Sequence, residues 1–136
     1  METKQVIVMR KDLNMRKGKM VAQGAHASLK VFFDLARSKI RFGNTIKYTI
    51  SFPEGAAGLE MDAWVEGIFT KITCSVNSEE ELLAVYNSAL EQKIPCSLIQ
   101  DVGKTEFNGV STYTCCAIGP ANIEAVNKIT GHLPLL

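Results

Sequence analysis

The sequence predicts an α/β protein built on a mixed β-sheet. Strand-like and helical segments alternate along the chain, which is typical of α/β architecture. Residues 5–10 form a β-branched apolar run of the kind found in a buried central strand. The link between the strand-like segments that end near residue 100 and begin near residue 110 is short enough for an antiparallel pair. Parallel and antiparallel strands are therefore expected in the same sheet.

Length and composition indicate one globular domain. The chain has 136 residues, of which 46% are hydrophobic and 21% charged, so we expect a single domain over residues 1–136. No apolar run approaches the ~20 residues of a membrane span, and no secretory segment is apparent at the start. We therefore expect a cytoplasmic location and no membrane contact.

The cysteines favour reduced, buried thiols. Cys74, Cys96, Cys115 and Cys116 include no CxxC pair and no histidine at zinc-ligand spacing. Adjacent cysteines on a strand point to opposite faces, so Cys115 and Cys116 are not expected to form a disulfide or a metal site. We expect no metal and no organic cofactor.

Charge is distributed unevenly along the chain. Residues 1–50 contain eleven Lys and Arg against three acids, whereas the remainder contains four against eleven. Such asymmetry is typical of a basic surface facing a polyanionic partner, although solvated charges alone could also produce it.

A long helix is predicted over residues 18–37. Two stripes recur at helical spacing. We expect the apolar stripe to face the core: Val21, Ala25, Leu29, Phe32 and Ala36. The second stripe is polar and lies beside small residues that would let another group approach: Lys19, Gln23, His26 and Lys30.

The remaining elements follow from alternation and turn signals. Residues 46–52 alternate as an extra half-buried strand, and residues 59–66 form one or two helical turns around Trp64. Ser78 and Glu81 form a capping box for a helix to residue 92. The other expected elements are strands at 68–76 (with Ile68, Thr70, Ile72, Cys74 and Val76 on one face), 95–100 and 110–118, and a last helix from Gly119-Pro120 to Gly131.

The start of the first helix is unusually basic. Arg16, Lys17 and Lys19 lie where the helix macrodipole already presents positive charge. Free backbone N–H groups together with added cations are typical of a phosphate site. The alternative is a basic first turn that is merely solvated.

Asp101 ends a predicted strand, the position where open α/β sheets place their ligands. Aspartate is also a common turn former there, so both interpretations stay open. Gly103-Lys104-Thr105 matches the end of a phosphate-binding P-loop, but the required earlier glycine is replaced by Leu98. Nucleotide hydrolysis is therefore rejected. His26 lies on a helix face of small residues and is more typical of a structural histidine than of a general base, because no Ser or Cys partner with a recognisable elbow accompanies it.

Several blocks, in order and spacing, resemble the second type of peptidyl-tRNA hydrolase, the form typical of archaea and eukaryotes. The blocks are QVIVMRKDL (5–13), GKMVAQGAHA (18–27), SEEEL (78–82), LIQDVGKT (98–105), AIGP (117–120) and ITGHL (129–133). The resemblance departs at Gly24, where the family often has Cys, and at Val102, where it often has Ala. The segment from about 39 to 58 is longer than the family usually places there.

This resemblance implies a mixed, mainly four-stranded sheet with helices on both faces, a homodimer, and hydrolysis of the ester that joins a peptide to the terminal ribose of tRNA. It implies catalytic roles for Lys19, Gln23, Asp101 and Thr105. We expect tRNA contacts from Arg10, Lys11, Arg16, Lys17, His26, Lys30 and Lys104.

Ester hydrolysis fits these residue types. Asp101 would orient or activate water, and Lys19 with Gln23 would stabilise the oxyanion or hold the terminal phosphates. Two alternatives remain. One is a catalytically silent module that binds tRNA or a protein. The other is a cysteine hydrolase that pairs Cys115 or Cys116 with His26.

Overall fold

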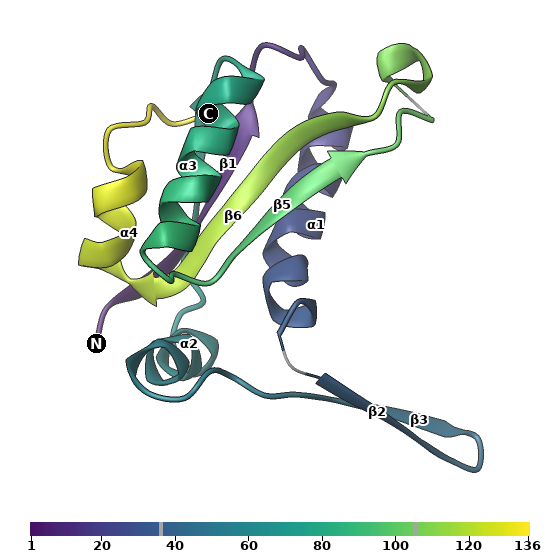
Figure 1. Ribbon diagram of the computed structural model, residues 1–136, viewed down its shortest axis with the longest axis vertical. Coiled ribbons are helices and arrows are strands. Elements are labelled where there is room, and N and C mark those ends of the chain that lie inside the picture. The colour runs from purple at the N-terminus through teal and green to yellow at the C-terminus, as the bar shows by residue number, and fades with distance from the viewer. Residues whose placement is uncertain (36, 105) are drawn as a thin grey trace.

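A computed structural model describes residues 1–35, 37–104 and 106–136, and it has helices on both sides of one mixed sheet (Figure 1). The elements are β1 (Thr3–Arg10), α1 (Lys17–Phe33), β2 (Arg37–Phe42), β3 (Thr45–Ile50), α2 (Ala56–Glu66), β4 (Lys71–Val76), α3 (Glu79–Glu91), β5 (Cys96–Asp101), a 3-10 turn (Phe107–Gly109), β6 (Thr112–Asn122) and α4 (Ile123–Thr130).

The main sheet has four strands in the order β4-β1-β6-β5. β1 pairs in parallel with β4 and antiparallel with β6, and β6 pairs antiparallel with β5. The expectations of a central β1 and a mixed sheet are confirmed. β1, β4 and β5 run in the same direction, so their carboxyl ends share one edge of the sheet with the beginning of β6.

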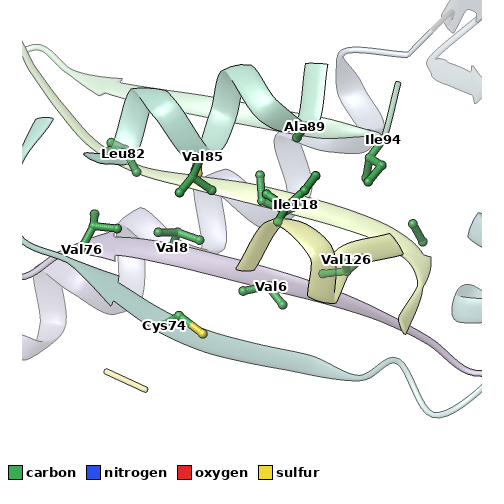
Figure 2. Packing of buried hydrophobic residues seen from close by; sticks show 13 residues of the cluster. Val6, Val8, Cys74, Val76, Leu82, Val85, Ala89, Ile94, Ile118 and Val126 are labelled. Atoms are coloured by element: carbon green, nitrogen blue, oxygen red, sulfur yellow. The ribbon is translucent and has the colours of Figure 1, made fainter. Parts of the chain in front are cut away.

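Two apolar clusters cover the two faces of the sheet. On one face, Val6 and Val8 of β1 pack with Leu82 and Val85 of α3 and with Val126 of α4 (Figure 2). On the other face, Ile7 and Met9 pack with Ala27 and Val31 of α1, and Met61 of α2 joins them. The side chains of β1 thus alternate between the two clusters, as the period of a strand requires. Trp64 is also buried.

The predicted orientation of α1 is wrong in part. Val21 and Leu29 are 73% and 59% exposed, whereas Gln23, Gly24, Ala27 and Val31 are buried. Small residues decide this orientation, because Gly24 and Ala27 let the helix backbone approach the sheet closely. A Cβ on Gly24 would already lie 3.7 Å from Ile7. α1 also ends at Phe33, short of the expected residue 37.

The region of the expected extra strand is a separate β-hairpin. β2 and β3 pair antiparallel from Arg37↔Ile50 to Phe42↔Thr45 and extend away from the main body beyond α1 (Figure 1). Gly43, with φ +54°, opens the two-residue connection. Glycine at this position suits a tight hairpin turn. The sequence reading recognised only the second strand of this pair.

The starts of β4, α4 and α3 can also be compared with the predicted ones. Ile68 is 92% exposed because β4 begins only at Lys71. α4 begins at Ile123 and not at Pro120, because the Asn122 side chain accepts the Ala125 N–H at 2.8 Å and caps the helix there. The predicted capping box is confirmed: Ser78 Oγ accepts from Glu81 N at 3.1 Å.

No helix within the described residues is long and apolar enough to cross a lipid bilayer.

Candidate active site

The carboxyl edge of the main sheet brings three elements together. β5 ends at Asp101, β6 begins at Thr112, and α1 begins at Lys17 directly after the loop that leaves β1. Strand direction and the β1-to-α1 connection therefore place the first turns of α1 beside the end of β5. Open α/β sheets commonly bind ligands at this edge.

Lys19, Gln23 and Asp101 meet there. Lys19 Nζ lies 2.6 Å from Asp101 Oδ2, and Gln23 Nε2 donates to the same oxygen at 3.2 Å. Lys19 and Gln23 stand one helical turn apart, so both reach one carboxylate from the same face of α1. The side chains of Lys19 and Asp101 are only 15% and 12% exposed. The result is a partly desolvated ion pair with an oriented amide beside it.

Thr114 orients that amide, and sequence reasoning missed it. The Thr114 hydroxyl, fully buried on β6, donates to Gln23 Oε1, which leaves Gln23 Nε2 directed at Asp101. Cys115 Sγ also donates to the Gln23 carbonyl at 3.3 Å. Threonine is common in strands, so its type gave no signal. The contact becomes apparent only when the position of β6 relative to α1 is known.

Gly103 completes the described contacts of Asp101. Its backbone N–H donates to Asp101 Oδ1 at 2.7 Å. Gly103 has φ +83°, and a Cβ there would lie 2.7 Å from backbone atoms of Val110, so a side chain would disturb the turn. Hydrogen bonds from Lys19 and then Gly103 lower the pKa of Asp101, against the smaller opposing effect of burial. The carboxylate is thus held ionised.

Two neighbours lie on the loop that follows Asp101. Lys104 is exposed, and the Phe107 ring centroid lies 5.9 Å from Lys19 Nζ. Thr105, the fourth expected catalytic residue, lies outside the described residues.

The basic residues expected to contact tRNA divide into two groups. Lys11, Arg16 and Lys17 are exposed around the start of α1, as is His26 one turn beyond Gln23. Arg10 differs: its side chain is 11% exposed, pairs with Asp12 at 2.7 Å and donates to the Tyr113 carbonyl at 3.0 Å. Arg10 thus ties the β1 exit to β6. Lys30 is exposed and pairs with Asp34 at 2.7 Å.

The first turn of α1 has no carboxylate of its own. Arg16 is the N-cap residue and its side chain makes no capping hydrogen bond, and the first turn contains no acidic residue. Its nearest acid is Glu106, at 4.0 Å from Arg16 Nε. The electropositive helix end predicted from the sequence is present in the structure.

The cysteines do not form a nucleophilic site. All four are free thiols; Cys74, Cys115 and Cys116 are buried and Cys96 is half-buried. Burial raises the pKa of Cys115 to about 12 and that of Cys116 well above its usual value. A thiol of this kind is a poor source of thiolate. Among the described residues, no cluster of three or more His, Cys, Asp or Glu could hold a metal.

Comparison with known proteins identifies the family of this chain. The family model described as peptidyl-tRNA hydrolase PTH2 matches residues 3–136. The chain belongs to this family. It is 41% identical to a peptidyl-tRNA hydrolase of Methanocaldococcus jannaschii, over 98% of this chain and 99% of that one. It is 40% identical to a peptidyl-tRNA hydrolase of Sulfurisphaera tokodaii, over the full length of both.

A solved structure supports the fold of this PTH2 member. A protein of unknown function from Agrobacterium tumefaciens superposes with a TM-score of 0.56 at 13% identity, covering 100% of this chain and 98% of that one. At this identity the likeness concerns the fold alone.

Proposed function

We infer that this protein hydrolyses the ester that joins a peptide, or an N-blocked amino acid, to the terminal ribose of tRNA, and so recycles peptidyl-tRNA. One observation carries the assignment to a site: Lys19 and Gln23 converge on the Asp101 carboxylate at the ligand-binding edge of the sheet in a PTH2 family member. Folding alone gives no reason to place a lysine and a glutamine amide on one poorly exposed carboxylate, because burying charge is costly.

Asp101 orients the attacking water in this mechanism. Its pKa is lowered by Lys19 and Gly103, so it stays a charged acceptor at neutral pH but is a weak proton acceptor. A carboxylate offers about four lone-pair directions. Donors within the described residues take three of them, from Lys19, Gln23 and Gly103. The direction on Oδ1 that no described residue occupies is where a water would be held against the ester carbonyl.

Lys19 stabilises the charge that develops on the carbonyl oxygen. Its ammonium is already positioned, so little reorganisation is needed as the oxyanion forms. The Gln23 amide is a second, neutral donor whose direction Thr114 fixes. The water oxygen bonds to the carbonyl carbon and the bond to the ribose oxygen breaks. One proton from water ends on that ribose oxygen, which gives tRNA with a free hydroxyl and a peptide with a free carboxyl group.

The substrate phosphates are held at the start of α1. Lys11, Arg16 and Lys17 are exposed there, and the uncapped helix end adds backbone donors. Lys104, His26 and Lys30 extend the contact to either side. The Arg10 guanidinium already donates hydrogen bonds to Asp12 and to the Tyr113 carbonyl. Any contact of Arg10 with phosphate would therefore be made by a group that is already engaged.

We propose that the reaction needs no metal, because each role above is taken by a side chain or a backbone group. Release of the acyl group in excess chelator, at the same rate as in its absence, is the expected result. Restoration of a lost rate by added Mg²⁺ or Zn²⁺ would contradict it. We also propose a cytoplasmic location, because the substrate is a product of translation; cell fractionation should find the protein with the translation machinery.

We further propose a homodimer formed through the exposed side of α1. Val21 and Leu29 line an apolar groove together with Phe69 and Leu136. An apolar surface of this kind is typical of a protein interface. Light scattering should give a dimer for the natural chain and a monomer for Val21→Lys/Leu29→Lys. Leu90→Lys, at a leucine of α3 that is 50% exposed, is the control and should leave the dimer intact.

The competing proposal is a silent tRNA-binding module on the same fold. The deciding experiment follows release of an N-blocked aminoacyl group from tRNA by the natural chain, Lys19→Ala and Asp101→Asn. Release by the natural chain that falls about 10²-fold or more in both variants is expected, the size of a lost oxyanion donor. Intact tRNA binding without release would favour the binding module.

A further inference from the structure

The β2–β3 hairpin carries positive charge that no described residue of the hairpin balances. Residues 37–50 contain four cations, Arg37, Lys39, Arg41 and Lys47, and no acid. The pairs Arg37↔Ile50, Lys39↔Tyr48 and Arg41↔Ile46 lie directly opposite each other. Opposite residues share a face of a ribbon. One face, here called the basic face, therefore combines three cations with Tyr48, Ile46 and Ile50.

Tyr48 lies among these cations. Its ring lies 6.0 Å from the Arg37 guanidinium and 5.7 Å from Lys39 Nζ, and the side chain is 49% exposed. Phe33, the last residue of α1, meets Tyr48 edge-on at 6.4 Å and lies 5.7 Å from Arg37. The basic face is thus anchored to the end of α1. Cations interleaved with an exposed aromatic ring are typical of nucleic-acid binding, where the ring stacks on a base.

The hairpin's charge distinguishes between an RNA and a protein occupant. Ile40 and Phe42 are exposed on the opposite face, and an isolated two-stranded hairpin is only marginally stable in water. A second copy could offer its apolar groove beside α1 to Ile40 and Phe42. The charged residues lining that groove are Lys17 and Lys71, which would repel the hairpin's cations. A polyanion matches the charge and also uses Tyr48.

We propose that the β2–β3 hairpin is a second tRNA-binding arm, which binds the nucleic acid at a distance from the ester. α1 separates the two regions: Lys19 lies near its start and the hairpin follows its end. A helix of 17 residues spans about 25 Å. Each strand of six residues adds up to about 20 Å. The arm therefore contacts phosphates and exposed bases in parts of the tRNA that lie away from its 3′ end, which is bound at Asp101. This inference rests on the proposed function for its choice of RNA.

The test measures binding of deacylated tRNA to the full chain over a range of salt concentrations. Each phosphate contact contributes about 0.7 to 0.9 to the slope of log affinity against log salt. Lys39→Gln/Arg41→Gln should lower the slope by about 1.5. Tyr48→Leu should weaken binding roughly ten-fold with little change of slope, since it removes stacking but no charge. The matched control, Lys93→Gln/Lys128→Gln, removes two exposed cations from α3's end and α4 and should change neither quantity.

The outcomes separate this proposal from the enzyme assignment. Binding does not depend on ester cleavage, so a chain that binds tRNA through the hairpin but releases no acyl group would refute the hydrolase and keep the arm. Equal slopes for the natural chain and Lys39→Gln/Arg41→Gln would overturn the arm. Equal slopes together with dissociation of a dimer on Phe42→Ser would assign the hairpin to a second copy instead.

Discussion

Lys19 Nζ lies 2.6 Å from Asp101 Oδ2, although 82 positions separate the two residues in the chain. Gln23 donates to the same oxygen and Gly103 to the other. The fold brings them together because β5 ends where α1 begins. The ion pair leaves the carboxylate charged and fixed in orientation, as a water-positioning group requires.

Replacement of Lys19 should affect turnover more than affinity. Lys19→Ala removes the ammonium that stabilises the oxyanion, so we expect kcat to fall about 10²-fold or more. The KM for peptidyl-tRNA should change less, because Lys11, Arg16 and Lys17 keep their phosphate contacts. Single-turnover release at saturating enzyme checks the prediction, with Lys128→Ala as a surface control. A near-normal kcat would exclude the oxyanion role.

Thr114 should act as a positioning residue through Gln23. Thr114→Val keeps the shape but removes the hydroxyl that holds Gln23 Oε1, so Gln23 loses its fixed direction toward Asp101. We expect kcat to fall about ten-fold and the free energy of unfolding to fall by about 1–3 kcal/mol, because a buried acceptor loses its partner. Thr114→Ser restores the hydroxyl and should recover kcat. Loss of stability with kcat unchanged would make the contact merely structural.

Asp101 should also govern stability in acid. Its pKa is lower in the folded protein than the ordinary value of about 3.9, so its contribution to stability is present above that pH. The contribution is lost as pH falls through the folded-state pKa. Urea unfolding of the natural chain and Asp101→Asn should therefore differ most at pH 5–6 and converge below about pH 4. A stability difference that widened on acidification would contradict this assignment.

Gly24→Ala should stabilise the protein. Gly24 lies within α1, and a Cβ there would meet Ile7 and Met9 at 3.7–3.8 Å, an ordinary packing distance. Glycine inside a helix costs about 0.5–1 kcal/mol relative to alanine. The free energy of unfolding should therefore rise by about that amount. Gly103→Ala is the contrasting variant and should destabilise, because its φ is positive and backbone atoms lie 2.7 Å from the added Cβ.

Much of the fold could be predicted from local pattern. The β-branched run of β1 indicated a central strand, and Ser78 with Glu81 marked the start of α3. The orientation of α1 could not be predicted from hydropathy. Close packing of α1 requires small residues at the sheet, so Gly24 and Ala27 face it. The larger Val21 and Leu29 lie on the exposed side of the helix.

The site and the hairpin show where sequence reasoning stopped. The motifs pointed to Lys19, Gln23 and Asp101, but Thr114 lay in an ordinary strand and only the three-dimensional register identifies it. The hairpin, by contrast, had a visible signal. Gly43 and Asn44 form a two-residue link between two strand-like runs, which is a common hairpin pattern.

The most direct measurement is a double-mutant cycle on single-turnover release, with the natural chain, Lys19→Ala, Asp101→Asn and the double variant. Groups that act as one unit have strongly non-additive effects. We predict that the double variant is no more than a few-fold slower than the slower single variant, with tRNA binding retained in all four proteins. Rate losses that simply multiply would contradict a joint role for Lys19 and Asp101.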